Sequence, residues 1–218
     1  MHTKNLLALS ALAALAASAA HATTTNINVS GSQGPWEQSI NPNLPYGTGD
    51  NQAPASASAG FDFAVGGVFT ITYISGTTTN GLGSSSYDAL GQTSYLANDN
   101  GGTSGDGFPS KNLPSSDYPV YLSEVVGAFA DANGKVIGTP FVVGDGAKET
   151  VTEVGVTQLL LGVNDDIFDD NSGSLTMQVS GPTAAGVPEP ATWAIMLAGF
   201  GGLGVAMRSR RRQPFAAI

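Results

Sequence analysis

The sequence predicts an all-β protein whose central domain is a jelly-roll-like β-sandwich, placed between two short apolar end segments. About eight short stretches alternate between apolar and polar residues or form brief apolar runs, as strands do. Glycine, proline or asparagine separates most of them, and no stretch of this central part repeats with the 3.6-residue period of a helix. The clearest strand-like segments are 26–30, 61–65, 68–74, 118–130, 135–143, 154–163 and 173–179.

Turn residues suggest how neighbouring strands connect. Gly66-Gly67 separates segments 61–65 and 68–74, a pattern typical of a β-hairpin. Asn133-Gly134 gives the same signal after segment 118–130, which we expect to be one long buried strand. Residues 31–59 and 75–116 are rich in glycine, proline and small polar residues, so we expect them to be loops.

The N-terminal segment has the three parts of a secretory signal peptide. A short polar stretch containing Lys4 precedes the apolar run 6–17, which is too short to anchor a protein across a bilayer. Ala20-His21-Ala22 supplies the small residues that signal peptidase requires. We therefore expect residues 1–22 to be removed by cleavage after Ala22.

The C-terminal segment combines a proline motif, an apolar run and a basic cluster. Pro188-Glu189-Pro190 precedes residues 191–207, which would form a helix of about 25 Å at 1.5 Å per residue. Trp193 lies one turn into that helix, at a depth suited to the membrane interface. The positive charges that follow favour a cytoplasmic C-terminus; they belong to Arg208, Arg210, Arg211 and Arg212.

Residues 187–213 closely resemble the PEP-CTERM sorting signal, in the variant with tryptophan three residues after the second proline. The resemblance implies processing by an exosortase, a membrane-embedded cysteine protease, with cleavage near the proline motif. It also implies a Gram-negative host that makes exopolysaccharide. The protein would first be anchored in the inner membrane facing the periplasm, and would then reach the cell surface or the extracellular matrix.

The remaining residues, 23–186, are long enough for one extracytoplasmic domain with a sizeable core. They hold all but one of the 17 acidic residues and only three lysines, for a net charge of about −13. Such a charge repels nucleic acid and anionic lipid, so neither is expected as a partner of the domain. It attracts divalent cations.

Two absences restrict the chemistry of the domain. The chain has no cysteine, and its only histidines, His2 and His21, belong to the predicted signal peptide. The mature domain therefore has no thiolate nucleophile, no Ser-His-Asp triad and no imidazole ligand for zinc. We expect a protein that is not an enzyme, and glycoside hydrolysis through carboxylates is the alternative that composition leaves open.

One acidic segment stands between the last two predicted strands. Its carboxylates and amides lie close together in sequence; they belong to Asn164, Asp165, Asp166, Asp169, Asp170 and Asn171. Calcium suits such a segment because it accepts six to eight oxygen ligands in irregular geometry. A solvated turn, in which aspartate and asparagine act as turn formers, explains the same residues. Both interpretations stay open at this point.

The second half of the domain also resembles small calcium-dependent galactose-binding lectins of bacteria, which are jelly-roll sandwiches. Asn164-Asp165 and Asp170-Asn171-Ser172-Gly173 match the positions at which those lectins hold calcium. The resemblance implies that Asp165, Asp170 and Asn171 are side-chain ligands, with a backbone carbonyl of Ile167 or Phe168 between them. The histidine and glutamine that contact sugar in those lectins have no counterpart, so galactose specificity is not implied.

These observations define three functional hypotheses. The first is a structural surface or matrix protein associated with exopolysaccharide. The second is a calcium-dependent, lectin-like module that binds the exopolysaccharide of the host. The third, which we favour least, is a carboxylate-based glycoside hydrolase.

Overall fold

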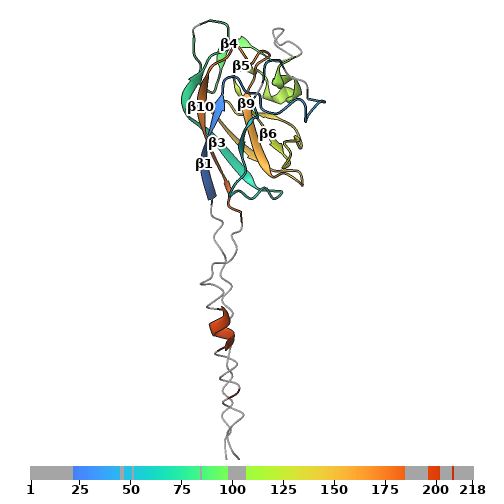
Figure 1. The fold of residues 1–218 in the computed structure, drawn as a ribbon, viewed down its shortest axis with the longest axis vertical. Coiled ribbons are helices and arrows are strands. Elements are labelled where there is room, and N and C mark those ends of the chain that lie inside the picture. The colour runs from blue at the N-terminus through green and yellow to red at the C-terminus, as the bar shows by residue number, and fades with distance from the viewer. Residues whose placement is uncertain are drawn as a thin grey trace, which may run out of the picture. The chain divides into compact units, whose positions relative to one another are not determined.

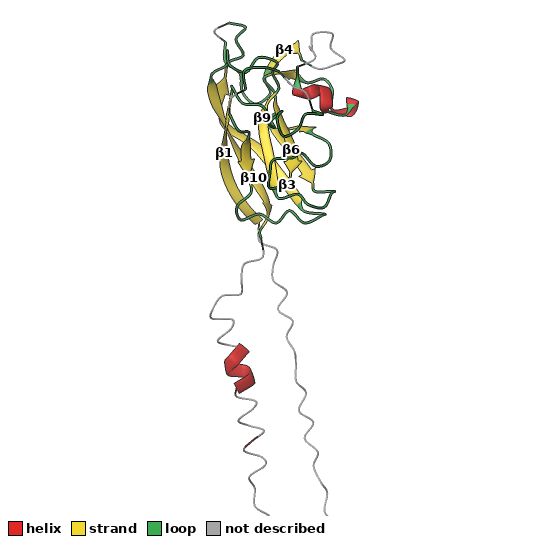
Figure 2. Cartoon of the chain, turned by 45° about the vertical axis from the view of Figure 1, so that its right-hand side comes forward, coloured by secondary structure: helices red, strands yellow, loops and turns green. Residues whose placement is uncertain are grey.

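The computed structural model describes residues 22–44, 47–50, 52–83, 85–97, 107–184, 196–201 and 208. The chain divides into two compact units, Met1–Thr183 and Ala184–Ile218. The described part of the first unit is built almost entirely of strands and the loops between them (Figures 1 and 2). Its strands are β1 (Ala22–Ser30), β2 (Ala55–Ala57), β3 (Val68–Thr78), β4 (Gln92–Leu96), β5 (Tyr121–Leu122), β6 (Val125–Ala130), β7 (Phe141–Val142), β8 (Gly146–Thr150), β9 (Gln158–Val163) and β10 (Gly173–Pro182). Two short 3-10 helices, η1 (Pro109–Asn112) and η2 (Ser115–Asp117), precede β5.

Eight of these strands form a β-sandwich, which confirms the predicted all-β class. The first sheet has the strand order β1-β10-β3-β8, and the second has the order β2-β9-β6-β7. All pairs within these sheets are antiparallel. The pairing is nested: the first strand pairs with the last, β2 with β9, and β3 with β8. The chain therefore runs as a double ribbon that passes repeatedly between the two sheets.

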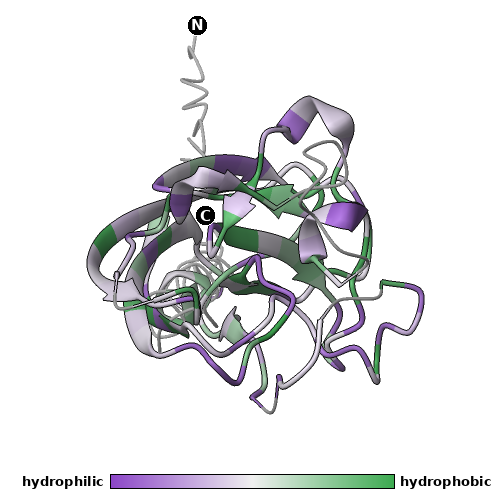
Figure 3. Ribbon diagram, turned by 90° about the horizontal axis from the view of Figure 1, so that it is seen from above, coloured by the Kyte–Doolittle hydropathy of each residue, from purple (hydrophilic) through white to green (hydrophobic). Residues whose placement is uncertain are grey.

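The core lies between the sheets, where apolar side chains of both meet. Phe69 of β3 contacts Phe129 of β6 edge to face, with ring centroids 5.7 Å apart. Phe63 stacks on Phe69 at 4.6 Å, and Phe141 of β7 packs against Phe129 at 5.5 Å. Such aromatic contacts add to the free energy gained from burying the rings. Figure 3 shows hydrophobic residues in the central strands and many hydrophilic ones in the surrounding loops.

The second sheet is covered on its outer face as well. Every residue of β6 is buried, and so is every residue of β9 after Gln158. The loop between β1 and β2 lies over this face, and a side chain at Gly162 would overlap the carbonyl of Gly34 and the nitrogen of Pro35. Trp36 follows in the same loop, is fully buried, and donates from Nε1 to the carbonyl of Leu44 at 3.0 Å. The loop therefore acts as a third layer over β9.

The predicted hairpin at Gly66-Gly67 is wrong. Residues 61–65 form no strand; Phe61 makes a single bridge to Thr183, and its side chain enters the core. The neighbours of β3 are instead β10 and β8, which lie far from it in sequence. The alternation reflects the burial of Phe61 and Phe63, but it did not indicate which strand pairs with β3.

The predicted single strand 118–130 is also wrong, because the chain turns in its middle. Ser123 has a positive φ of 63° and separates β5 from β6. Segments 135–143 and 154–163 contain shorter strands than expected, β7 and β9. Three strands, β2, β4 and β8, lie in segments where no strand was predicted. Their short or polar sequences carry little periodic signal. β2 and β8 pair with the longer strands β9 and β3, and β4 pairs with β5.

The close approach of the loop to β9 leads to a prediction about Gly162. Replacing Gly162 with alanine should lower the free energy of unfolding by about 1–3 kcal/mol, because a methyl group there overlaps the backbone at Gly34 and Pro35. Gly146 of β8 is a matched control, since the nearest atom to an added methyl group lies 3.5 Å away. Denaturant unfolding should show no comparable loss for Gly146→Ala. Equal stabilities of the two variants would contradict this description of the covering loop.

Candidate functional site

The predicted acidic segment is the loop between β9 and β10, and its first residue holds the surrounding chain together. Asn164 is fully buried. Its Oδ1 accepts from the amide of Ser110 at 2.9 Å, and its Nδ2 donates to the carbonyls of Ala97 and Tyr121 at 2.8 and 3.0 Å. Both ends of this amide are used within the protein. Asn164, which the sequence suggested as a metal ligand, therefore serves as a structural anchor.

Asp165 is the buried carboxylate of the loop, only 2 % exposed. Its Oδ1 accepts from the backbone amides of Asp166 and Ile167 at 2.7 and 3.2 Å. Its Oδ2 accepts from Nδ2 of Asn171 at 2.8 Å. Burial raises the pKa of Asp165 to about 7, although these three hydrogen bonds lower it. The loop thus encloses a carboxylate with an unusually weak preference for the charged form.

Asn171 is the second predicted ligand that lies at this point. Its Nδ2 also donates to the carbonyl of Gly31 at 2.9 Å, which ties the loop to the end of β1. Its Oδ1 is buried and has no hydrogen-bond partner among the described residues. A buried acceptor without a partner costs free energy. It is therefore the atom of this loop best suited to a ligand.

The other acidic side chains of the loop point to different neighbours. The carboxylate of Asp170 lies against Gly81, and that of Asp169 lies against Gly49. Asp166 is partly exposed, and its carbonyl accepts from the amide of Thr48 at 2.8 Å. The structure therefore joins Asp165 to Asn171 by a hydrogen bond, while the carboxylates of Asp169 and Asp170 lie against Gly49 and Gly81. Within the described ranges, no group of three or more acidic or histidine side chains is arranged to hold a metal ion.

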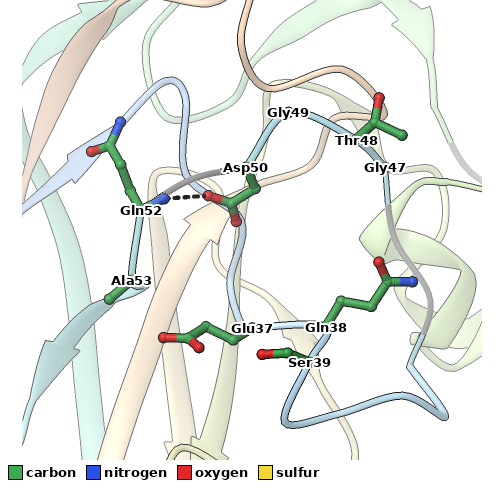
Figure 4. Close-up of a pocket in the computed structure, with 9 residues that line it drawn as sticks. All are labelled: Glu37, Gln38, Ser39, Gly47, Thr48, Gly49, Asp50, Gln52 and Ala53. Atoms are coloured by element: carbon green, nitrogen blue, oxygen red, sulfur yellow. Dashed lines mark hydrogen bonds between the residues drawn. The ribbon is translucent and has the colours of Figure 1, made fainter.

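A cleft of about 530 Å³ adjoins this loop (Figure 4). Its wall at residues 47–50 is the segment that pairs with Ile167 through Thr48. Two carboxylates, of Glu37 and Asp50, are among its lining groups. Oδ2 and Oδ1 of Asp50 accept from the backbone amides of Gly34 and Gln52, at 2.8 and 3.1 Å. These bonds position the loop backbone.

No sequence pattern indicated this cleft, because its residues are distributed over a region expected to be an irregular loop. The remaining lining groups are small or uncharged; they belong to Gln38, Ser39, Gly47, Thr48, Gly49, Gln52 and Ala53. Amides and hydroxyls of this kind can bind a polar ligand without a strong charge preference. These residues follow no recognisable spacing in the sequence, so the sequence alone does not identify them as a binding site.

Glu124 is a second buried carboxylate that sequence reasoning missed. It is 5 % exposed, and its Oε2 accepts from the amide of Tyr121 at 2.8 Å. Burial raises the pKa of Glu124 to about 7, the hydrogen bond from Tyr121 lowers it, and the nearby charge of Asp145 raises it. Its backbone carbonyl accepts from the amide of Asn164, so it lies beside the same anchor as Asp165. In the sequence, the only sign of this buried carboxylate is a charged residue directly before the apolar segment 125–130.

The sorting residues lie mostly outside the described part of the chain. This applies to Pro188, Glu189, Pro190, Trp193, Arg210, Arg211 and Arg212, and to residues 1–21 of the predicted signal peptide. Residues 196–201 are helical and exposed, as is Arg208. β1 begins at Ala22, the residue after which cleavage is predicted. No helix in the described residues is both long and apolar enough to cross a membrane.

The C-terminal segment is the part of the chain that matches a known protein family model. Residues 186–212 match the PEP-CTERM protein-sorting motif. The PEP-CTERM motif implies an exported protein that is anchored at the membrane before an exosortase processes it. It covers the predicted proline motif, apolar run and arginine cluster. No curated protein matches the chain significantly.

The buried carboxylate of Glu124 leads to a prediction about pH. Its pKa of about 7 in the folded protein exceeds the ordinary value of 4.5, so the unfolded chain loses this proton first as pH rises. As pH rises from about 4.5 to about 7, ionisation of Glu124 should therefore lower the free energy of unfolding by up to about 3 kcal/mol.

Glu124→Gln keeps an oxygen for the amide of Tyr121 and cannot ionise. Thermal unfolding of this variant should show a smaller loss of stability from pH 4.5 to pH 7 than the wild type shows. Asp88→Asn is a control, because Asp88 is exposed and asparagine keeps the oxygen that accepts from the amide of Leu90. Identical pH profiles for Glu124→Gln and wild type would contradict the assignment.

Proposed function

We propose that the chain is the precursor of an exported surface or matrix protein that associates with exopolysaccharide and has no catalytic activity. The observation that carries the proposal is the PEP-CTERM motif at residues 186–212. The apolar run would hold the precursor in the inner membrane of a Gram-negative cell, with the sandwich facing the periplasm. Signal peptidase would act after Ala22 and an exosortase near Pro188–Pro190. The released domain would then reach the cell surface or the matrix.

We further propose that the sandwich is a jelly roll. A jelly roll has eight strands in two sheets and is built from two Greek keys. The nested pairing of β1 with β10, β2 with β9 and β3 with β8 supports this assignment. So does the equal division of the eight strands between the two sheets. In such a fold, the loop from β9 to β10 lies at one end of the sandwich, where ligand-binding loops are common.

A second candidate function is calcium-dependent, lectin-like binding of carbohydrate. The observation in its favour is the buried Oδ1 of Asn171, which has no partner in the described chain and belongs to the side chain that contacts Asp165. A calcium ion would provide charge for Asp165 and a partner for this oxygen. Asp166 and Asp170 could complete the ligand set only by turning towards the ion, since Asp170 now faces Gly81. Asn164 would contribute by fixing the start of the loop.

The less favoured candidate is a glycoside hydrolase that acts through carboxylates. Such an enzyme needs two carboxylates facing each other across a cleft, one of them with a raised pKa. Glu37 and Asp50 line the cleft, but Asp50 is engaged by backbone amides. The two carboxylates whose pKa is raised to about 7, Glu124 and Asp165, do not line it.

The sorting proposal predicts two cleavages in the host. Mass spectrometry of the protein recovered from the cell surface or medium should show an N-terminus at Thr23 and the loss of Trp193 and everything after it. Deleting the exosortase gene should leave the C-terminal segment attached. Recovery of surface protein that still carries residues 191–207 would contradict sorting by an exosortase.

The calcium proposal predicts a stabilisation that depends on the β9–β10 loop. At 100 times its dissociation constant, an ion bound only by the folded state stabilises by about 2.7 kcal/mol. For a domain of this size, the melting temperature of the full chain in mild detergent should rise by roughly 5–10 °C. Asp165→Asn should remove most of that rise, and Asp170→Asn should do the same if Asp170 turns to the ion.

The variants also separate loss of calcium binding from loss of folding. In chelator, circular dichroism and thermal melting show whether Asp165→Asn is folded. The variant removes the buried charge, but it also replaces the oxygen that accepts from Nδ2 of Asn171 with an amide nitrogen. Asp62→Asn is the matched control, since Asp62 is exposed and its Oδ1 accepts a local bond from Ala64 that asparagine can keep. A full calcium response in both loop variants would leave the loop as a solvated turn.

A further inference from the structure

The outer face of the first sheet carries, along β1 and β10, a regular array of uncharged hydrogen-bonding side chains. Along β1, the exposed outward residues are Thr24, Asn26 and Asn28. Their partners in the register on β10 are Ser180, Gln178 and Thr176. The inward residues of β10, such as Met177 and Val179, are buried in the core. The alternation of the strands therefore places amides and hydroxyls on one flat face.

These side chains are held in three rows that cross the two strands. Thr24 and Ser180 share a hydrogen bond between their hydroxyls at 2.8 Å. Nε2 of Gln178 donates to Oδ1 of Asn26 at 3.3 Å, and Oγ1 of Thr176 donates to Oδ1 of Asn28 at 3.2 Å. Neighbouring rows lie about 7 Å apart, because two residues separate them along each strand. The lateral bonds reduce the rotamer freedom that a ligand would otherwise have to remove.

The rows continue onto the next strands without gaining negative charge. Ser180 pairs with Thr70 and Gln178 with Thr72, both of which are exposed on β3. Beyond Thr70 lies Lys148 of β8, also exposed. None of the 17 acidic residues occupies an outward position of these four strands. Glu149 of β8 pairs with Phe69, whose side chain is buried in the core, and so lies on the opposite face.

Two amide nitrogens and one amide oxygen of the array remain available to a ligand. Oδ1 of Asn26 and Oδ1 of Asn28 accept the lateral bonds, while their Nδ2 groups have no partner among the described residues. Oε1 of Gln178 is likewise without a partner in the described chain. The face thus presents preorganised donors and acceptors together, in a pattern that repeats along the strands.

We propose that this face, with Asn26, Asn28 and Gln178 at its centre, binds a neutral polysaccharide in an extended conformation. Sugar hydroxyls both donate and accept hydrogen bonds, so they match an array that offers both. A neutral chain avoids repulsion by the acidic domain, which an anionic glycan or nucleic acid would meet. A protein partner is less well suited, because the cores of protein interfaces are rich in aromatic and apolar side chains. The inference rests on the proposed association with exopolysaccharide and names the surface responsible for it.

The proposal is tested by affinity electrophoresis of the full chain in mild detergent, in gels containing glucomannan or a mixed-linkage β-glucan as neutral probes. Alginate is the acidic probe. The face variant combines Asn26→Ala, Asn28→Ala and Gln178→Ala, and the matched cleft variant combines Gln38→Ala, Ser39→Ala and Gln52→Ala. We expect the wild type and the cleft variant to be retarded equally by at least one neutral probe and not by alginate. The face variant should bind at least tenfold more weakly.

Circular dichroism and thermal melting show whether the face variant is folded. If it is not, the single variants Asn26→Ala and Asn28→Ala replace it, and each should weaken retardation severalfold. Equal binding by wild type and face variant, or a loss confined to the cleft variant, would overturn the assignment of this face while leaving association with polysaccharide intact. Retardation by alginate alone, or by none of the probes, would also overturn it. None of these results affects the sorting proposal, which is tested separately by the cleavage sites.

Discussion

The double burial of β9 and β6 is the constraint on which the rest of the molecule depends. Their inner residues meet the first sheet through contacts such as Phe69 with Phe129, and their outer residues are equally buried. An apolar face left exposed to water would cost free energy in proportion to its area. The long loop after β1 removes that cost by packing over β9, and it can approach so closely because residue 162 has no side chain.

The same constraint determines where the polar features of the sandwich lie. The covering loop forms the cleft between Glu37 and Asp50, and its segment 47–50 pairs with the β9–β10 loop. Loops gathered on one sheet leave the outer face of the other sheet uncovered. That face carries Asn26, Asn28 and Gln178 instead of apolar residues, because it is solvated. The two sheets are thus different in kind, one enclosed and one presented to solvent.

Asn164 shows how a polar residue at the end of a buried strand can organise a site without being part of it. Its amide fixes three backbone segments, and the two buried carboxylates, Glu124 and Asp165, lie on either side of it. Both have a pKa raised to about 7 by burial. Proton or cation binding at Asp165 would therefore act on the loop that joins β9 to β10, while Glu124 would act on the turn before β6. The acidic loop is tied into the fold by these hydrogen bonds, and Asp169 and Asp170 lie against Gly49 and Gly81.

Several features could be predicted from the sequence, because each depends on residues that are close together in the chain. The signal for sorting is contiguous, so the proline motif and the arginine cluster could be read without a structure. Alternation of apolar residues marked the segments that contain Phe61, Phe63 and Phe69, all of which are buried in the core. The absence of helical periodicity indicated the all-β class. The acidic loop was correctly placed between the last two strands.

Pairing partners and side-chain convergence were decided only by the tertiary structure. The sequence around Gly66-Gly67 indicates a hairpin, yet β3 pairs with β10 and β8, because closing the sandwich buries more apolar surface than a local hairpin could. Asn164 and Asp165 are neighbours with the same expected role, but one became an anchor and the other a buried carboxylate. Which atoms of such residues meet depends on segments far away in the chain, such as those of Ser110, Gly31 and Gly81. Composition and spacing determine what a residue can do, and only long-range packing determines which partner it finds.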